Sequence, residues 1–420
     1  MNIWLVTIGE ELPVVPDIRK ARTALLADHL LAKGHNVLWW TSTFDHFKKK
    51  HLFEKDSEVD VKDGYKIKAL KGTGYKKNIS LSRIIDHRLI ARKFKKTAPR
   101  MPRPDIIVAS LPSYDLAYEA VMYARRHKIP VLVDIRDQWP DIFLEHVPSP
   151  FRGLVRVLIR REFFLAEEAI RSANGLIAMM DSLLNWGLEY AGRPKEWQDR
   201  VFYLGFKRND AAGSRSEKIS RLMEPLKDKF IVTFFGTFGR YHNPLILVKG
   251  AEKMKDHDVH FVIAGDGELM KEIRAAAVRL PNVSLPGWLN QNEISTLLMY
   301  SHVGVCSTPL DAEFFPNKAF VYLSAGLPVL SAFRGDIEKF IEEHRIGFSY
   351  PPNDADAFAE CVKKLRDSGE LYQAMSANAL RVYNTLLESD RIYNEYTEHI
   401  EKVFDHGRTL RPEKSRGDST

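Results

Sequence analysis

The sequence is poor in cysteine and has no long apolar run. Its 420 residues include Cys306 and Cys361 alone as cysteines, far from the CxxC spacing of a structural zinc site or a redox pair. A secreted fold held by several disulfides is therefore excluded, and both thiols are expected to be buried and unreactive. No window approaches the roughly eighteen uninterrupted apolar residues of a membrane-spanning helix.

Signals for targeting, cofactors and metals are missing as well. The start, MNIWLVTIGE, lacks the basic region and small-residue cleavage site of a signal peptide, which favours a cytoplasmic protein. The first strand-like segment is not followed by GxGxxG, so a dinucleotide cofactor is not expected. The histidines lack zinc-binding spacing, and the DxD motif at 354–356 precedes a helix, where an acidic cap is expected. We expect neither a metal nor a cofactor.

Positive charge is concentrated in one stretch. The chain has a formal charge of +7, whereas residues 61–104 contain fourteen Lys or Arg against two acids, a net charge of +12. This stretch also contains apolar and aromatic residues, namely Tyr65, Tyr75, Ile84, Ile85 and Phe94. A solvated basic face, a nucleic-acid patch and a lipid-facing surface therefore compete as interpretations. No helix-turn-helix, zinc-finger or RRM signature accompanies it, which disfavours nucleic acid. We expect residues 61–104 to face an anionic inner-membrane surface.

The alternation of strand-like and helix-like segments predicts two α/β domains. In the first half, strands are expected at 2–9, 35–42, 105–110, 130–137 and 175–180, and helices at 18–34, 117–128 and 156–173. In the second half, strands at 230–236, 259–267, 283–288 and 303–309 alternate with helices at 244–254, 268–280, 292–301 and 316–326. Such alternation is typical of βαβ units and of mostly parallel sheets.

Composition suggests where the domains end. Residues 203–219 are polar and small, as in an interdomain linker. We predict an N-terminal acceptor-binding domain over 1–205, a nucleotide-sugar-binding domain over 206–385, a helix over 386–405 that packs back on the first domain, and a disordered tail over 406–420. The predicted architecture is two Rossmann-like, doubly wound domains that face each other across a cleft.

Four loops at the expected carboxyl ends of the second set of strands carry residues suited to a phosphate ligand. In open α/β sheets ligands bind at this edge, where loop amides and helix N-termini converge. The candidates are Gly236, Gly239 and Arg240 in FFGTFGR, Gly265, Gly267 and Glu268 in IAGDGE, Ser307 in CSTPL, and Glu313 and Lys318 in EFFPNKAF. Each signal alone is weak, because a glycine pair after a strand more often forms a tight turn.

In this order the motifs resemble the donor-binding domain of the GT-B glycosyltransferases of family 4, which retain anomeric configuration. TIGEELP, GYKKNISLSRIIDHR and VDIRDQWPD resemble the acceptor domain of a bacterial subgroup, the L-fucosamine-transferase-like enzymes of O-antigen and surface polysaccharide synthesis. The resemblance covers residues 1–405. It implies a GT-B fold, no metal, a UDP- or GDP-sugar donor and a lipid-linked glycan acceptor.

The resemblance assigns roles to the donor residues. Arg240 and Lys318 match the cationic pair that neutralises the donor diphosphate, whose negative charge grows as it leaves. Glu313 matches the first carboxylate of a Glu-x7-Glu motif, which meets hydroxyls of the transferred sugar, and Val321 stands where the second is usual. Because Val321 cannot accept a hydrogen bond from ribose, donor binding is expected to weaken by on the order of 1 kcal/mol while the phosphate grip persists.

Candidate acceptor residues lie in the first half. Asp137 is expected to orient or deprotonate the acceptor hydroxyl, and Arg136 to hold a phosphate of a lipid-linked acceptor. An ion pair that closes a helix N-terminus is the competing interpretation of these two residues. The resemblance implies that Gly9 lets its loop pass close to the donor phosphates, and Glu10 or Glu11 is expected to touch the acceptor.

The sequence therefore predicts a retaining transferase of a hexose or amino sugar, cytoplasmic and peripheral on the inner face of the membrane. Two alternatives stay open: a catalytically weak homologue that acts as a scaffold, and a peripheral protein that binds nucleotides or polyanions. Donor turnover separates the transferase from both alternatives.

Overall fold

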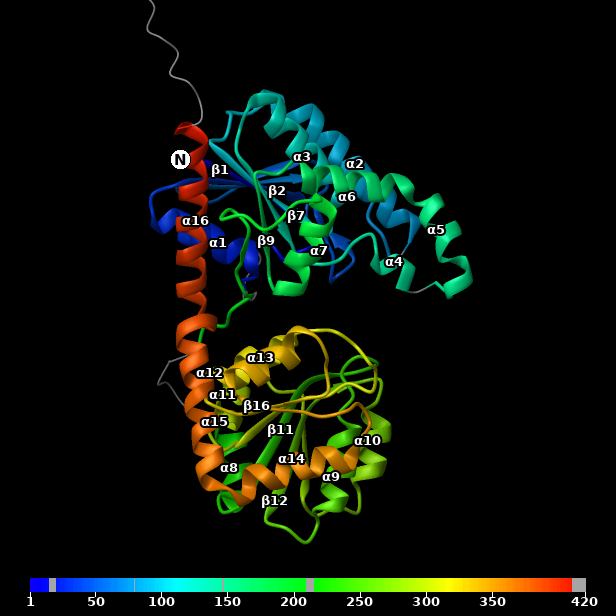
Figure 1. Ribbon diagram of the computed structural model, residues 1–420, viewed down its shortest axis with the longest axis vertical. Coiled ribbons are helices and arrows are strands. Elements are labelled where there is room, and N and C mark those ends of the chain that lie inside the picture. The colour runs from blue at the N-terminus through cyan, green and yellow to red at the C-terminus, as the bar shows by residue number, and fades with distance from the viewer. Residues whose placement is uncertain (15–19, 79, 146, 209–214, 410–420) are drawn as a thin grey trace, which may run out of the picture. The chain divides into compact units, whose positions relative to one another are not determined.

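The chain forms two compact units, each built on its own sheet (Figure 1). The computed structural model describes residues 1–14, 20–78, 80–145, 147–208 and 215–409. Unit 1 comprises Met1–Tyr203 and Ile392–Thr420, and unit 2 comprises Leu204–Arg391. Unit 1 therefore combines the N-terminal half of the chain with a helix from its C-terminal end.

Unit 1 contains an eight-stranded sheet in the order β10-β9-β8-β7-β1-β2-β6-β5. Its strands are β1 (Asn2–Val6), β2 (Asn36–Ser42), β5 (Ser57–Lys62), β6 (Tyr65–Leu70), β7 (Ile106–Leu111), β8 (Val131–Ile135), β9 (Gly175–Ala178) and β10 (Arg200–Val201). A short antiparallel ladder joins β3 (Phe44–Asp45) to β4 (Lys50–His51). All neighbours in the large sheet are parallel except β5 and β6, so the predicted parallel architecture is confirmed.

Helices cover both faces of this sheet. They are α1 (Arg22–Ala32), α2 (Leu81–Thr97), α3 (Tyr114–His127), α4 (Ile142–Glu145), α5 (Arg152–Leu158), α6 (Arg160–Arg171), α7 (Asp181–Ala191) and α16 (Ser389–Thr409). Successive side chains of a strand point to opposite faces. Trp4 and Trp40 accordingly join the core shared with α2, α3 and α6. Leu5 and Trp39 join the core shared with α1 and α16.

The single helix predicted over 156–173 is two helices in the structure. The break falls at Ile159, whose φ of −103° and ψ of 24° leave the helical region. Helix α6 buries Phe163, Ala166 and Ile170 against the core, whereas α5 has no buried residue. Core packing therefore explains the apolar pattern of α6 but not that of α5.

The C-terminal helix is longer than expected. Residues 406–409, predicted to be disordered, form the last turn of α16, where the Arg408 guanidinium stacks over the Phe404 ring. The remainder of the predicted tail, 410–420, lies outside the described residues. Across the described chain, no helix has both the length and the apolar character needed to cross a bilayer.

Unit 2 contains a six-stranded, fully parallel sheet in the order β13-β12-β11-β14-β15-β16. Its strands are β11 (Phe230–Phe238), β12 (Val259–Gly267), β13 (Val283–Gly287), β14 (Val303–Cys306), β15 (Val329–Ser331) and β16 (Gly347–Ser349). Its helices are α8 (Glu217–Met223), α9 (Leu245–Lys253), α10 (Met270–Ala277), α11 (Gln291–Leu298), α12 (Asn317–Ser324), α13 (Asp336–His344), α14 (Ala355–Asp367) and α15 (Gly369–Val382). Asp354 of the DxD motif caps α14 by accepting a hydrogen bond from Ala357 N, as expected.

Candidate active site

Two strands and a helix of unit 2 converge on the Lys318 amine at the carboxyl edge of the sheet. Lys318 stands in the first turn of α12, and its Nζ lies 3.6 Å from the centre of the Phe234 ring on β11. A Cβ atom on Gly236 would lie 3.5 Å from the same nitrogen, so the glycine leaves space beside the amine. Cys306, the last residue of β14, is the thiol that interacts with it electrostatically. Residues from three separate motifs thus form one local site.

The Lys318 amine is a buried cation that has no carboxylate counterion among the residues the structure describes. The side chain is 9% exposed, and among the described residues its Nζ has no hydrogen-bond partner. Burial lowers the pKa of Lys318 to about 8, partly opposed by Cys306. A buried charge without a partner destabilises a fold, and such groups concentrate where ligands bind. An anion placed beside Lys318 would offset this cost.

Two other buried polar groups accompany Lys318. In the described part of the chain, Ser307 Oγ and His242 Nδ1 find no hydrogen-bond partner. Burial, with repulsion from Lys318, lowers the pKa of His242 to about 4, so its imidazole is neutral. The imidazole packs against the rings of Phe314 and Phe333. No motif pointed to His242 in the sequence, because its burial beside Lys318 becomes visible only in the folded chain.

Gly239 and Arg240 belong to a tight turn after β11. Backbone hydrogen bonds run both ways between Gly239 and His242, at 3.0 and 3.1 Å. Glu268 Oε1 accepts a hydrogen bond from Arg240 N at 3.1 Å, which ties this turn to the end of β12. The Arg240 side chain is exposed. Glu268, predicted to bind the donor, therefore positions the loop that presents Arg240.

Gly265 and Gly267 are required by the sheet itself. Their φ angles are +148° and +152°, and a Cβ on Gly265 would lie 1.9 Å from the carbonyl oxygen of Gly236. A Cβ on Gly267 would lie 2.1 Å from the carbonyl oxygen of Phe238. These two glycines, predicted as donor-binding residues, allow β12 to pair with β11 up to the end of both strands.

Glu313 and Val321 flank the same edge. Glu313 is exposed and lies beside Gly335, where a Cβ would be 3.3 Å from the Glu313 side chain. Gly335 immediately precedes α13, so the carboxylate lies near a helix N-terminus. Val321 is half-buried on α12, three residues after Lys318. Val321 therefore lies on the same face of α12 as Lys318.

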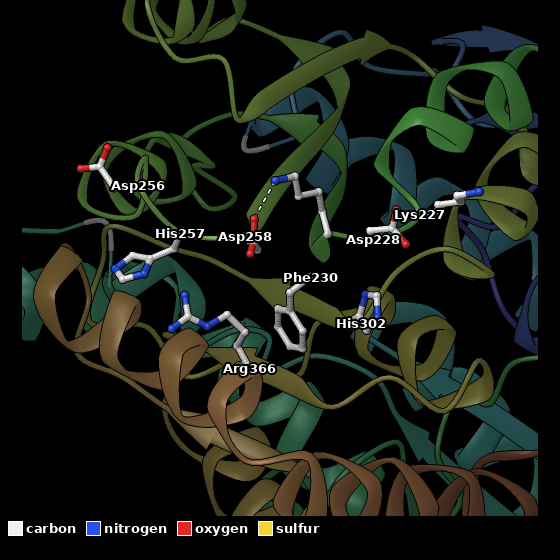
Figure 2. A pocket seen from close by; sticks show the side chains of 9 residues that line it. Lys227, Asp228, Phe230, Asp256, His257, Asp258, His302 and Arg366 are labelled. Carbon is white, nitrogen blue, oxygen red and sulfur yellow. Dashed lines mark hydrogen bonds and ion pairs between the residues drawn. The ribbon is translucent and has the colours of Figure 1, made fainter.

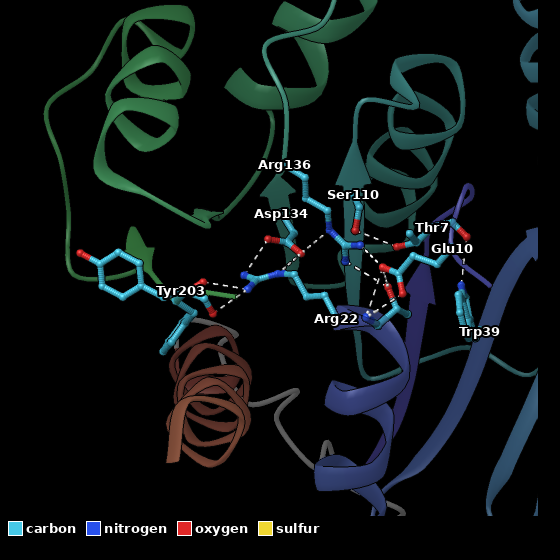
Figure 3. A network of polar contacts seen from close by, with 10 residues as sticks. Thr7, Glu10, Arg22, Trp39, Ser110, Asp134, Arg136 and Tyr203 are labelled. Atoms are coloured by element: carbon cyan, nitrogen blue, oxygen red, sulfur yellow. Dashed lines mark hydrogen bonds and ion pairs between the residues drawn. The ribbon is translucent and has the colours of Figure 1, made fainter. Parts of the chain in front are cut away.

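In unit 1 the predicted acceptor residues form a network of buried charges (Figure 3). Arg136 pairs with Glu10 and donates from Nε to Asp134 Oδ2 at 2.9 Å. Asp134 also accepts two hydrogen bonds from Arg22, both at 3.0 Å. Glu10 accepts from the backbone N of Thr23 at 3.0 Å. Glu10 and Arg136, which we expected to face the acceptor, are thus engaged with each other and with the fold.

The network stays ionised because its charges offset one another. Burial alone would raise the pKa of Asp134, but Arg22 and Arg136 hold it below its usual value. Burial opposes the charge of Arg22 and Arg136, and Asp134 nevertheless raises both pKa values. Arg22 also donates to the carbonyl oxygen of Phe202 at 2.7 Å. We conclude that these charges hold β8, α1 and the segment after β10 together.

Asp137, predicted to act on the acceptor, and Gly9, predicted to lie close to the donor phosphates, stand outside this network. The Asp137 carboxylate accepts hydrogen bonds from Gln138 N at 2.9 Å and Trp139 Nε1 at 3.0 Å. Burial raises the pKa of Asp137 in spite of these bonds. A half-buried carboxyl with a raised pKa suits proton transfer. Gly9 follows β1 with a φ of +92° and has no atom within 4 Å of where its Cβ would be.

A pocket of about 540 Å³ lies at the opposite, amino edge of the unit 2 sheet (Figure 2). Phe230, Asp258 and His302, which line it, stand at or just before the first residues of β11, β12 and β14. Lys229 pairs with Asp258 at 2.7 Å, so charges of the wall neutralise each other. Ligands of parallel sheets bind at the carboxyl edge. We therefore assign the site to the surroundings of Lys318.

The described residues hold no group of three or more His, Cys, Asp or Glu side chains arranged to bind a metal ion. Residues 229–368 match the family model described as glycosyl transferases group 1. Among curated proteins, the chain is 27% identical over 207 residues to the O-antigen chain mannosyltransferase C of Escherichia coli, covering 48% of this chain and 54% of that protein.

The chain is also 26% identical over 200 residues to the E. coli UDP-Gal:α-D-GlcNAc-diphosphoundecaprenol α-1,3-galactosyltransferase, covering 45% of this chain and 50% of that protein. The matches thus span about half the length of both relatives. Among solved structures, Anabaena HepE in complex with UDP aligns with a TM-score of 0.67 at 18% identity, covering 96% of this chain and 100% of that one. The fold is therefore GT-B, as predicted, and residues 229–368 are similar to the glycosyl transferases of group 1.

Proposed function

We propose that the protein is a retaining glycosyltransferase of family 4 that moves a hexose or an amino sugar from a nucleotide sugar. The observation that carries the proposal is the buried Lys318 amine, which has no hydrogen-bond partner among the described residues and lies beside Gly236. Its charge would stabilise the diphosphate leaving group, and most strongly in the transition state, when the negative charge on that group is largest. Ser307 and the exposed Arg240 supply further donors to the phosphates.

The acceptor in this proposal is a lipid-linked glycan of bacterial surface polysaccharide. The names of two relatives support it, since one acts on an O-antigen chain and the other on a sugar diphosphoundecaprenol. In unit 1, Asp137 orients or deprotonates the acceptor hydroxyl, because its raised pKa favours holding a proton. Glu313 binds hydroxyls of the transferred sugar. The enzyme belongs to the L-fucosamine-transferase-like subgroup, uses no metal and works at the cytoplasmic face of the membrane.

The test is release of nucleoside diphosphate from a panel of UDP- and GDP-sugars with a lipid-diphosphate acceptor. We expect Lys318→Ala to lower the turnover by about a hundredfold or more. Lys249→Ala, which removes an exposed lysine of α9, is the matched control and is expected to keep full turnover. The anomeric configuration of the product, measured by NMR, tests retention. Absence of release with every donor, or full activity of Lys318→Ala, would overturn the proposal.

A further inference from the structure

Helix α5 of unit 1 presents its apolar side chains to solvent. Neither α5 nor the turn Ser149–Phe151 before it has a buried residue. Phe151, Leu154, Val157 and Leu158 are 58%, 61%, 62% and 72% exposed. They recur three or four residues apart, so they lie along one stripe of the helix. An apolar stripe of this size marks a surface that something covers.

The same segment is strongly basic. Residues 147–161 contain four arginines and no Asp or Glu. Arg152, Arg156 and Arg160 recur every four residues and are all exposed. Long basic side chains beside an apolar face reach upward to charged headgroups while the face enters the membrane interface. The pattern is therefore that of a helix lying in an anionic interface.

Helix α2 contributes two exposed apolar side chains nearby. Leu81 and Ile85 are 77% and 55% exposed. They share a stripe of α2 with Arg88, because residues three or four apart lie on one helix face. Arg88 forms an ion pair with Glu162 in the first turn of α6, directly after α5. The apolar stripe of α2 thus leads to the junction of α5 and α6.

We propose that α5, with Phe151 before it, is an interfacial anchor that docks unit 1 on an anionic lipid membrane. Phe151, Leu154 and Leu158 enter the region between headgroups and acyl chains, and the exposed arginines of the same segment bind lipid phosphates. A second copy of the chain fits this surface poorly, since a symmetric contact would set arginines against arginines. The anchor deepens the proposed function, because it brings unit 1 to the surface that carries a lipid-linked acceptor.

The sequence alone favours a different surface, residues 61–104. Seven of its fourteen basic residues are paired with acids from outside the stretch: Lys62 with Asp28, Lys66 with Asp60, Lys68 with Glu58, Lys71 with Glu54, Arg88 with Glu162, Lys93 with Asp56, and Lys95 with Glu119. Tyr65, Tyr75 and Phe94 are buried, so they cannot touch lipid. The structure thus leaves this stretch with less free charge than its count suggests.

The experiment measures sedimentation of the full chain with vesicles, in the absence of any sugar donor. Vesicles of phosphatidylcholine alone are compared with vesicles that also contain phosphatidylglycerol. The wild-type chain is expected to bind the anionic vesicles. The double variant Leu154→Ser, Leu158→Ser is expected to lose at least about tenfold in affinity for them. The triple variant Arg152→Gln, Arg156→Gln, Arg160→Gln is expected to lose about a hundredfold. Circular dichroism checks that the variants fold.

Two matched controls separate α5 from other surfaces. Val278→Ser with Met299→Ser removes comparably exposed apolar side chains from unit 2, and Lys76→Gln, Lys77→Gln, Lys96→Gln removes charge from residues 61–104. Both are expected to bind as the wild type does. Transfer to a water-soluble acceptor analogue is expected to be unchanged in the α5 variants, so failure of docking and failure of the transferase proposal give different results.

Three results would overturn the anchor. The first is absence of wild-type binding to anionic vesicles. The second is wild-type binding that the α5 variants keep, which would assign docking to residues 61–104 if the lysine variant lost it. The third is self-association of the wild type in ultracentrifugation that Leu154→Ser, Leu158→Ser abolishes without any effect on vesicles, which would assign α5 to a contact between copies.

Discussion

The two units treat buried charge in opposite ways. In unit 1, Arg22 and Asp134 are 2% and 0% exposed and bind each other through two hydrogen bonds. In unit 2, Lys318 is 9% exposed and its amine has no hydrogen-bond partner among the described residues. Desolvation of an ion is offset by an opposite charge in the first case, and in the second by the Phe234 ring and the Cys306 thiol, neither of which is a formal counterion. Buried charges with partners hold the fold of unit 1, whereas the buried charge without one is available to an anionic ligand.

The largest effect is expected from breaking the network of unit 1. Asp134→Ala leaves the guanidinium groups of Arg22 and Arg136 buried without their shared carboxylate. Removing one partner of a buried ion pair costs about 3–5 kcal/mol. We expect that loss in the unfolding free energy of unit 1, measured by hydrogen exchange of the β8 amides.

The matched control for this change is Asp60→Ala, which removes an exposed carboxylate paired with Lys66. It is expected to leave exchange at β8 unchanged, because exposed ion pairs contribute little. Equal exchange in the Asp134→Ala and Asp60→Ala chains would show that the network does not stabilise unit 1.

In unit 2, removal of the buried charge of Lys318 is expected to raise the stability of the ligand-free fold. Burial lowers the pKa of Lys318 from 10.5 to about 8, so its charge costs the ligand-free fold on the order of 3 kcal/mol. Lys318→Met keeps most of the length of the unbranched side chain and removes the charge. We expect a higher unfolding temperature without ligand and loss of UDP or GDP binding, measured by calorimetry.

Lys249→Met is the control for the change at Lys318, because Lys249 is exposed on α9. It is expected to alter neither the unfolding temperature nor the binding of nucleotide. A Lys318→Met chain that is less stable than the wild type would mean that the amine has a structural partner in solution.

The pH dependence sharpens the comparison further. Below pH 8 the Lys318 amine is charged in both the folded and the unfolded chain, and the folded chain carries the full cost. Between about 8 and 10.5 the amine loses its proton in the folded chain first, so the unfolded chain holds more protons and stability rises with pH.

Binding of a nucleoside diphosphate is expected to show the reverse trend. The phosphates are already ionised above pH 8, so the change in affinity follows Lys318. We expect the affinity to fall by up to about tenfold per pH unit above that point. Isothermal titration at several pH values measures this affinity. The control Lys249→Met is expected to give the same pH profile as the wild-type chain. A flat profile from neutral pH to pH 10.5 would show that the charge of Lys318 does not bind the ligand.

The sequence predicts the architecture well, because strand and helix periodicity is local. It also names Lys318 and Ser307, since their motifs stand at the carboxyl ends of strands. It does not show that the Lys318 amine is buried without a partner, because burial depends on Phe234 and Cys306 from other strands. His242 gave no signal for the same reason.

Unit 1 shows more clearly what local sequence patterns do not predict. Glu10 and Arg136 are separated by 126 residues and pair because the strand order β8-β7-β1 brings their loops together. Nothing local in either motif indicates this pair. The sequence left both an acceptor contact and an ion pair open for Arg136, but it did not indicate Glu10 as the partner. Similarly, the acids that neutralise much of residues 61–104 come from β5 and from more distant elements, which a charge count over one stretch omits.

The smallest effect is expected at Val321, three residues from Lys318 on α12. If the resemblance assigns the second carboxylate position correctly, Val321→Glu adds a hydrogen bond to ribose worth about 1 kcal/mol, or about fivefold in affinity for UDP or GDP. Inorganic pyrophosphate has no ribose, so its affinity is expected not to rise. Val321→Gln is the control, because it accepts a hydrogen bond without adding charge, and it is expected to show part of the gain. Tighter binding of pyrophosphate in Val321→Glu, or weaker binding of both ligands, would instead mean that the new carboxylate acts on the Lys318 amine, and that this position never faced the ribose.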